Sequence, residues 1–326
     1  MTRPLLASGS PHRASSQCVW AGILNVDKPA GLTSHDVVAL VRRAAGQRKV
    51  GHAGTLDPMA TGVLLVCLDK ATRVTEYLMA SPKTYYAIIC LGASTTTDDA
   101  EGEIVARSQV QVSYAEIESA LQQFVGRIEQ TPPVYSALKR EGQRLYRLAR
   151  QGQAPALLPR PVEIYAARIA EWTPPLLHLE VRCGPGTYIR ALARDLGRAL
   201  GCGAHVASLR RTASGRFTVD QALPLPQIEA AFAAGTAGQL LYPIDAAVAD
   251  LPALYLDTAA SLQLVAGRAI AAEVEPPPTG SLARAYTPTR QFIAIVAWDS
   301  AMSSWLPRKV FAEVGDLGPR DGESPG

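Results

Sequence analysis

The chain has 326 residues, of which 48% are hydrophobic and 19% charged, a composition typical of a globular protein with a sizeable core. No apolar run approaches the roughly 20 residues that a membrane-spanning helix needs, and no secretory signal opens the sequence. The five cysteines form no Cys-x-x-Cys pair and do not lie at metal-ligand spacing from the five histidines. These features predict a cytoplasmic protein with reduced thiols, no bound metal and no membrane attachment.

The net charge is only +3, but the charge is unevenly distributed. Between residues 131 and 216 there are 14 lysines and arginines against 5 acidic residues, whereas the rest of the chain is mildly acidic. Such an asymmetry is typical of a face that binds a polyanion, and it also fits a set of solvated helix surfaces. Charge alone does not separate these two interpretations.

The first third of the chain predicts a strand, a capped helix, a loop and a second strand. Residues 22–26 form a short apolar run, and Thr33 with Asp36 has the spacing of a capping box at a helix start. Residues 51–58 are rich in glycine and turn formers, which predicts a loop without regular structure. That loop leads into residues 62–68, an apolar and β-branched run that predicts a buried strand.

The next part predicts a strand over residues 84–91, followed by a polar loop over residues 94–102. Ser113 and Glu116 again have capping-box spacing, so we expect a second helix that ends before Gly126.

The basic segment of residues 140–150 has helical spacing, with leucines on one face and arginines on another. Two further strands are expected at residues 161–172 and 177–183. A Gly-Pro-Gly turn follows, and Thr187 is expected to cap a helix that ends at Gly201.

Strands and helices mix without regular βαβ alternation, and no glycine-rich phosphate loop follows a strand. This pattern favours an α+β fold around a mostly antiparallel sheet. Near the C-terminus, short strands at residues 284–286, 292–297 and 309–314 alternate with Gly/Pro turns, which suits a small β-barrel. We therefore predict a flexible N-terminal tail, a large domain, a small domain and a disordered end, over residues 1–21, 22–247, 248–314 and 315–326.

Asp57 is the first candidate for a reactive group. An aspartate before Pro58 in a glycine-rich loop has an ordinary explanation, because aspartate favours turns and proline restricts its predecessor. However, the loop lies at the mouth of a buried strand, where a scaffold holds reactive groups rigidly. His52 lies in the same loop, and Arg190 at a helix start is a natural partner for a buried carboxylate.

Several short motifs occur in one order that a chance match would not produce. The sequence Gly51-His52-x-Gly-Thr-Leu-Asp57-Pro-x-Ala-Thr-Gly-Val-Leu resembles the signature of the TruB-type family of bacterial pseudouridine synthases. The resemblance is strong over residues 22–217 and loose beyond them. The other matching motifs are Asp27-Lys28-Pro29, Lys83-Thr84-Tyr85, Thr131-Pro132-Pro133-Val134-Tyr135-Ser136-Ala137, Gly186-Thr187-Tyr188-Ile189-Arg190, Gly201-Cys202-Gly203-Ala204-His205-Val206 and Leu209-Arg210-Arg211.

The resemblance implies a pseudouridine synthase fold, with a mostly antiparallel mixed sheet flanked by helices and a small C-terminal PUA-like RNA-binding barrel. It implies that the chain flips uridine 55 out of the T loop of tRNA, cleaves the C1′–N1 bond, rotates the base and forms a C1′–C5 bond. The product has the same atoms as the substrate, so no cofactor is expected. By the same resemblance Asp57 is the essential catalytic carboxylate.

Two routes remain open for that carboxylate. Cleavage of a glycosidic bond builds positive charge at C1′, which Asp57 could capture or stabilise. Alternatively, Asp57 could remove the proton at C2′. Both routes need an ionised carboxylate, and we expect Arg190 to lower its pKa.

By resemblance, Tyr85 stacks on the uracil and takes the C5 proton, while Tyr188 and Leu209 line the base pocket. His52 contacts the displaced part of the T loop. Taken singly, Tyr85, Tyr188 and Leu209 also fit ordinary core positions, and His52 fits a turn residue satisfied by backbone groups.

The basic residues of the middle third are candidates for phosphate contacts, which give salt-dependent and largely sequence-independent affinity. These candidates are Lys139, Arg140, Arg144, Arg147, Arg150, Arg210 and Arg211.

The chain departs from the family pattern in its polar loop. Many relatives read Thr-Asp-Thr there, whereas this chain has Thr95-Thr96-Thr97, followed by Asp98 and Asp99. We expect this loss of one acid to alter a contact to RNA and to leave the catalytic positions intact.

Two alternatives to the synthase were considered. A non-catalytic RNA-binding or tRNA-folding protein on the same scaffold would be free to lose Asp57, Tyr85 or Arg190, and all three are present. A glycoside hydrolase or nucleosidase would need a second acid to activate water, and none is suggested by the motifs. The fit to the stand-alone bacterial type predicts a monomer that recognises tRNA directly, without a guide RNA or an obligatory protein partner.

Overall fold

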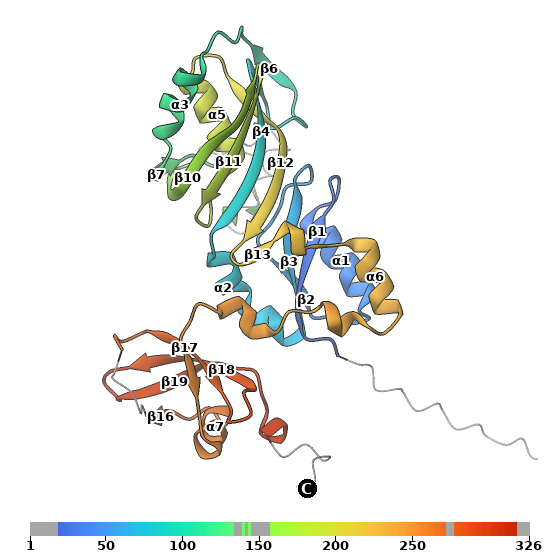
Figure 1. The fold of residues 1–326 in the computed structure, drawn as a ribbon, viewed down its shortest axis with the longest axis vertical. Helices are drawn as coiled ribbons and strands as arrows, with labels where there is room; N and C mark the ends of the chain where they lie inside the picture. Colours follow the sequence, from blue (N-terminus) through green and yellow to red (C-terminus); the bar gives the residue numbers. More distant parts are fainter. Residues whose placement is uncertain (1–18, 134–138, 141–142, 145–156, 272–276, 318–326) are drawn as a thin grey trace, which may run out of the picture.

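A computed structural model of the chain describes residues 19–133, 139–140, 143–144, 157–271 and 277–317. These residues form a large mixed sheet flanked by helices and a second, smaller sheet near the C-terminus (Figure 1). The α+β class with a mostly antiparallel sheet is confirmed. In the described part of the chain, no helix is both long and apolar enough to cross a membrane.

The strands of the large sheet are β1 (Gly22–Lys28), β2 (Val50–Ala53), β3 (Thr61–Leu68), β4 (Lys83–Leu91), β7 (Gly126–Gln130), β10 (Arg160–Thr173), β11 (Leu176–Cys183), β12 (Ala204–Ser214), β13 (Phe217–Thr218) and β14 (Leu223–Pro224). Their order is β14-β1-β3-β12-β4-β11-β10-β7, with β2 paired to β3 and β13 paired to β12. The pairs β1–β14 and β3–β12 are parallel, and the other pairs are antiparallel. The parallel β3–β12 pair joins the part of the sheet that contains β14, β1, β2 and β3 to the antiparallel part from β12 to β7.

Helices cover both halves of this sheet. Helices α1 (Ser34–Ala44) and α6 (Leu225–Ala233) lie beside β1 (Figure 1), whereas α3 (Tyr114–Gln122) lies beside β10 and α5 (Ile189–Ala199) packs against β12 and β4. Both expected capping boxes are confirmed, at Thr33 for α1 and at Ser113 for α3. The short helix α2 (Thr75–Ala80) follows the 3₁₀ helix η1 (Asp69–Val74) below β3.

Strand β3 shows why its sequence is apolar at nearly every position. Leu64, Val66 and Leu68 belong to the core cluster that contains residues of α1, α3, α5 and α6. Val63, Leu65 and Cys67 point to the opposite face and belong to a second cluster that contains residues of η1, α2 and the C-terminal sheet. A strand buried on both faces reads as a continuous hydrophobic run, and this one was predicted correctly.

The smaller sheet contains β15 (Ala253–Tyr255), β16 (Ile270–Ala271), β17 (Leu282–Tyr286), β18 (Phe292–Asp299) and β19 (Ser304–Val310), and helix α7 (Thr258–Val265) packs on it. The strand order is β15-β17-β18-β19-β16. The sheet has its own core, in which Trp298 and Trp305 meet edge to face with ring centroids 5.4 Å apart. We expected its last strand at residues 309–314, which was wrong because the hairpin after β18 begins the strand at Ser304.

Three local predictions need correction. The helix expected over residues 140–150 is wrong at its start, because β8 (Lys139–Arg140) and β9 (Gln143–Arg144) form an antiparallel pair; residues 145–150 lie outside the described residues. The loop expected over residues 51–58 begins within β2, since β3 supplies a hydrogen-bonding partner. The polar loop expected over residues 94–102 likewise begins within β5 (Ala93–Thr95), which pairs with β6 (Ile104–Arg107).

The remaining short elements connect these parts. They are four 3₁₀ helices among the described residues. The 3₁₀ helices are η2 (Val219–Gln221), η3 (Ala237–Leu240), η4 (Ile244–Val248) and η5 (Val314–Leu317).

Candidate active site

The loop that carries Asp57 connects β2 to β3 and is held from two sides. On one side, the N–H of Leu56 donates to Ser34 Oγ at 2.9 Å, and Ser34 Oγ donates back to the Leu56 carbonyl at 3.2 Å. On the other side, the Arg211 guanidinium donates to the Gly54 carbonyl at 3.2 Å. A loop fixed on both sides presents its carboxylate in one orientation.

A close approach of the backbone explains one glycine of the signature. Gly62, at the start of β3, has φ +96°, and a Cβ atom at this position would lie 2.2 Å from the Arg211 carbonyl oxygen. Only glycine combines this φ with such a contact.

Asp57 and Arg190 form a bidentate ion pair. Arg190 Nε lies 2.9 Å from Asp57 Oδ2, and Arg190 Nη2 donates to Asp57 Oδ1 at 3.0 Å. The arginine side chain is 4% exposed, whereas the aspartate side chain is 32% exposed, so the carboxylate keeps a free face. The pairing expected from the sequence is therefore present.

The same guanidinium reaches a second carboxylate. Arg190 Nη1 lies 3.3 Å from Asp99 Oδ2 and donates to the Thr97 carbonyl at 3.0 Å. The neighbouring Asp98 pairs with Arg194, at 3.0 Å. The polar loop after β5 is thus attached to α5 by two buried or half-buried ion pairs.

Sequence reasoning missed this role of Asp98 and Asp99, which we had treated only as flanking a contact to RNA. A signal was available. Arg190 and Arg194 are four residues apart and therefore lie on one face of a helix, where they match two adjacent acids in a loop.

A cavity of about 520 Å³ opens beside Asp57. It is bounded by the β2–β3 loop, the end of α2, the start of β4, the β11–α5 turn and β12. The five residues predicted for catalysis or for the base pocket line it together: Asp57, Tyr85, Tyr188, Arg190 and Leu209. Arg211, predicted as a phosphate contact, lines it as well.

The wall formed by Tyr188 is fixed by a buried amide. Gln130, at the end of β7, donates through Nε2 to the Tyr188 carbonyl at 3.1 Å and accepts the Tyr188 N–H at 2.8 Å. Thr187 was expected to cap α5, but its hydroxyl donates to the Gly184 carbonyl instead, at 3.0 Å. The N-cap residue is Tyr188, which makes no side-chain cap bond, so the expected Thr187 cap was wrong and the backbone at the start of α5 is held by Gln130.

His52 does not line this cavity. It lies in β2, where its ring meets that of His35 edge to face with centroids 5.3 Å apart. The two histidines thus form a partly exposed pair beside the loop that carries Asp57.

The charge balance of the site differs from our expectation. Burial raises the pKa of Asp57, Arg190 opposes this rise, and the nearby Asp99 adds to it. We had expected Arg190 to lower this pKa, and it does, but desolvation is the larger effect and the pKa is raised overall. Burial also lowers the pKa of Lys28 and of Lys83, each to about 8.

The candidates for phosphate contact fall into three groups. Arg210 is 40% exposed and pairs with Asp27 at 2.9 Å. Arg211 is only 1% exposed and donates to backbone carbonyls, so our expectation of a surface phosphate contact does not fit it. Lys139, Arg140 and Arg144 lie in β8 and β9, where only the backbone is described. Arg147 and Arg150 lie outside the described residues.

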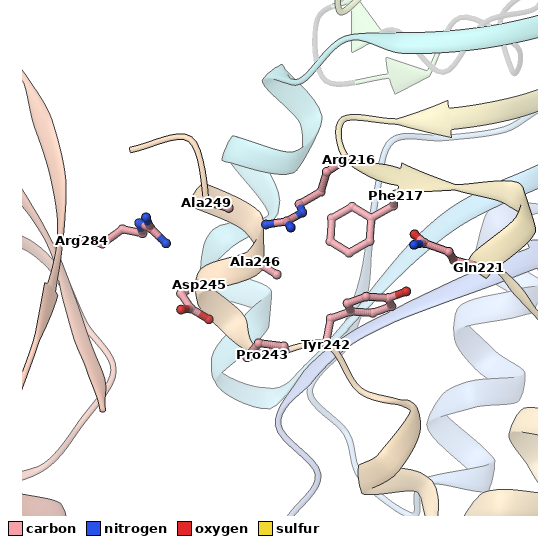
Figure 2. A pocket seen from close by; sticks show the side chains of 9 residues that line it. All are labelled: Arg216, Phe217, Gln221, Tyr242, Pro243, Asp245, Ala246, Ala249 and Arg284. Atoms are coloured by element: carbon pink, nitrogen blue, oxygen red, sulfur yellow. The ribbon is translucent and has the colours of Figure 1, made fainter. Parts of the chain in front are cut away.

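Other possible sites are limited. Within the described ranges, no group of three or more His, Cys, Asp or Glu side chains is placed to hold a metal ion. A second pocket of about 270 Å³ lies at the junction with the smaller sheet, where Arg216, Tyr242, Asp245 and Arg284 line it (Figure 2). None of the residues predicted from the sequence to form a site lines this junction pocket.

Comparison with solved structures identifies the fold. The chain superposes on a chain in the crystal structure of a Cbf5–Nop10–Gar1 complex with a TM-score of 0.71 and 28% identity, covering 92% of this chain and 87% of that one. A chain in an archaeal box H/ACA sRNP Nop10–Cbf5 complex gives 0.69 and 25% identity, covering 93% and 89%. The fold is the pseudouridine synthase fold.

Sequence comparison gives the family. Residues 42–189 match the TruB family pseudouridylate synthase N-terminal domain, and residues 190–249 match the tRNA pseudouridylate synthase B C-terminal domain. The chain is 45% identical to tRNA pseudouridine synthase B of Dehalococcoides mccartyi, over 89% of this chain and 96% of that protein. It is 45% identical to the Gloeobacter violaceus protein of the same name, over 86% and 95%. The chain belongs to the TruB family of pseudouridine synthases.

Proposed function

We propose that the chain is a tRNA pseudouridine synthase that isomerises uridine 55 in the T loop of tRNA. One observation carries the proposal: Asp57, Arg190 and Tyr85 line one pocket in a chain 45% identical to proteins named tRNA pseudouridine synthase B. The residues come from three separate segments, so the fold itself assembles the set.

The size of the pocket supports an action on a single nucleotide. A cavity of about 520 Å³ falls within the roughly 300–1,000 Å³ typical of small-ligand sites. A base stacked inside folded RNA cannot reach a carboxylate at the bottom of such a cavity. The proposal therefore includes flipping of the uridine, with Tyr188 and Leu209 as walls for the base and His52 in contact with the displaced loop.

Asp57 is the proposed essential carboxylate. When the C1′–N1 bond breaks, positive charge develops at C1′, and an ionised carboxylate either stabilises that charge, captures it or removes the C2′ proton. Each route needs a fixed and ionised Asp57, and the two-pronged contact with Arg190 fixes it. Tyr85 holds the detached uracil while it rotates, and C5 then bonds to C1′.

The proposed domain organisation follows from the two sheets. Residues 22–247 form the catalytic domain and residues 248–314 form a PUA-like RNA-binding module, between a tail at residues 1–21 and an end at residues 315–326. The separate core of the smaller sheet supports this division. Phosphate contacts are proposed for the remaining basic candidates, which are Lys139, Arg140, Arg144, Arg147, Arg150 and Arg210.

The enzyme is proposed to act in the cytoplasm as a monomer, without a guide RNA, a cofactor or an obligatory protein partner. The relatives at 41–45% identity carry the name of a single enzyme. The solved neighbours at 25–28% identity come from complexes that include Nop10. The closer similarity therefore favours the stand-alone type.

The test is incubation of the purified protein alone with a tRNA transcript, followed by mapping of pseudouridine. We expect modification at position 55, and none when the transcript has cytidine at that position. Tight binding of tRNA without any pseudouridine would refute the enzyme and favour a non-catalytic tRNA-folding protein.

A further inference from the structure

Arg211 lies directly beside Tyr85 in the large sheet. It belongs to β12, which pairs antiparallel with β4, and the register places Arg211 opposite Tyr85. Residues opposite one another in an antiparallel pair point to the same face of the sheet. Both side chains line the cavity that contains Asp57.

The contacts of Arg211 connect two parts of the site. Its guanidinium faces the Tyr85 hydroxyl across the paired strands and lowers the pKa of that hydroxyl. It also donates to the carbonyls of Gly54, at 3.2 Å, and Thr55, at 3.4 Å, in the loop that carries Asp57. A third bond, 2.6 Å long, reaches the Val63 carbonyl in β3. A guanidinium has five N–H donors in a rigid fork, so one side chain can hold these three carbonyls and still direct its charge at the Tyr85 hydroxyl.

The chemistry of the buried charge is unusual. Arg211 is 1% exposed, and its hydrogen-bond partners among the described residues are neutral oxygens. A buried cation whose partners are neutral leaves a positive potential in its surroundings. The Tyr85 hydroxyl lies within that potential, on the wall of the cavity.

We propose that Arg211 is a positioning residue for pseudouridine formation, which holds the Tyr85 oxygen relative to the Asp57 loop and stabilises negative charge on that oxygen during proton transfer. The inference rests on the proposed function. Isomerisation breaks the C1′–N1 and C5–H bonds and forms the C1′–C5 and N1–H bonds. A hydroxyl that gives its proton to N1 and takes the proton from C5 ends unchanged, and between these steps it is a phenolate beside Arg211.

The electrostatics of Tyr85 support this role. Burial raises the pKa of the Tyr85 hydroxyl, while the charge and the hydrogen bond of Arg211 lower it. Without Arg211, the phenolate would be formed in a desolvated site with no compensating charge beside it. Arg211 therefore favours the state that the proton transfer requires.

The competing explanation is that Arg211 only braces the loop through its carbonyl contacts. The two explanations differ in one respect, because a brace acts independently of the Tyr85 hydroxyl. A double-mutant cycle with Arg211→Lys and Tyr85→Phe separates them. Pseudouridine formation is measured for all four proteins in single turnovers with enzyme in excess over tRNA.

We expect Arg211→Lys to slow the reaction by at least about tenfold when Tyr85 is intact, and by less than about twofold in the Tyr85→Phe background. Equal slowing in both backgrounds would overturn the proposal. Leu65→Ala is the matched control, since Leu65 is fully buried on the opposite face of the sheet. Its effect should be the same in both backgrounds.

A second measurement keeps the test decisive if Arg211→Lys does not fold. In Tyr85→Phe, with Arg211 intact, loss of the hydroxyl should loosen the coupling to the loop. We expect faster amide hydrogen exchange over residues 54–57 than in the wild type, and unchanged exchange would overturn the proposal.

The outcomes also separate this inference from the proposed function. A wild-type protein that forms no pseudouridine would contradict the proposed function and this inference with it. An active wild type whose double-mutant cycle is additive would contradict the role of Arg211 alone.

Discussion

An arginine, a tyrosine and an aspartate meet at two places in this molecule. At the junction with the smaller sheet, Arg284 Nη1 donates to the Tyr286 hydroxyl at 3.1 Å, and that hydroxyl donates to Asp245 Oδ2 at 2.6 Å. Asp245 comes from η4 and Arg284 from β17, so this set joins the connecting segment to the smaller sheet (Figure 2).

In the pocket, the same residue types are connected differently. Asp57 is paired with Arg190, and the Tyr85 hydroxyl faces a second arginine, Arg211. The carboxylate and the hydroxyl thus each have a cation as partner.

The two hydroxyls differ in the charges around them. Burial and the bond to Asp245 both raise the pKa of Tyr286, and Arg284 opposes the rise. For Tyr85, burial raises the pKa and Arg211 opposes the rise. The same residue types therefore form different sites, because the Tyr286 hydroxyl donates to a carboxylate, whereas at Tyr85 the carboxylate Asp57 is paired with a separate arginine, Arg190.

The largest effect should come from Asp57→Asn. We expect it to lower turnover by at least about a thousandfold, because the amide can neither stabilise charge at C1′ nor accept the C2′ proton. Binding of tRNA should stay within a few-fold of wild type. Gel-shift and nucleotide analysis on one preparation check both, and retained turnover would refute the assignment.

Arg190→Met should affect both stability and activity. It leaves Asp57 and Asp99 without their shared cation, and breaking a buried pair costs about 3–5 kcal/mol. Urea denaturation measures this loss. Arg198→Met on the same helix is the control: its side chain is 76% exposed, and it should change stability by less than about 0.5 kcal/mol. Equal losses of unfolding free energy in the two variants would contradict the stabilising role of the buried ion pair.

The pH dependence should reflect the raised pKa of Asp57. The ionised fraction falls as the pH falls through that pKa, so the acid limb of the rate should begin at higher pH than for an ordinary aspartate, about 3.9. A raised pKa means that the folded protein binds this proton more tightly than the unfolded chain does. Protonation of Asp57 therefore does not itself destabilise the fold, and rates should fall while circular dichroism is unchanged.

The smallest effect should come from the junction. Tyr286→Phe removes the hydrogen bonds of this hydroxyl to Asp245 and Arg284, at a cost of about 1–3 kcal/mol in the free energy of unfolding, and should leave the single-turnover rate within about twofold of wild type. Tyr85→Phe should instead slow the chemical step by more than about tenfold. If Tyr286→Phe and Tyr85→Phe slowed the reaction equally, the claim that the two tyrosines have different roles would be wrong.

Much of the fold could be predicted from sequence because the signals were local. The capping boxes at Thr33 and Ser113 satisfy backbone groups within one helical turn, and the apolar run of β3 reports burial on both faces. The helix expected to start at Arg140 failed because helical spacing over a short segment does not exclude a hairpin. Periodicity cannot decide between the two at that length.

The site was predictable only in part. Asp57, Tyr85 and Arg190 occur in motifs, and the structure brings them to one cavity. Asp99 and Gln130 were missed because their partners are distant in sequence, and Arg211 was misassigned because its burial depends on the pairing of β12 with β3 and β4. The spacing of Arg190 and Arg194 gave a signal for the acids, whereas the contacts of Gln130 and Arg211 join distant segments and leave no local pattern.

The central claim is that this pocket isomerises one uridine of tRNA. The most direct test is to incubate a mixed tRNA pool that lacks pseudouridine with the purified protein alone, and to map every modified nucleotide. The account predicts pseudouridine at position 55 across the pool. Modification elsewhere, or none at all, would contradict it.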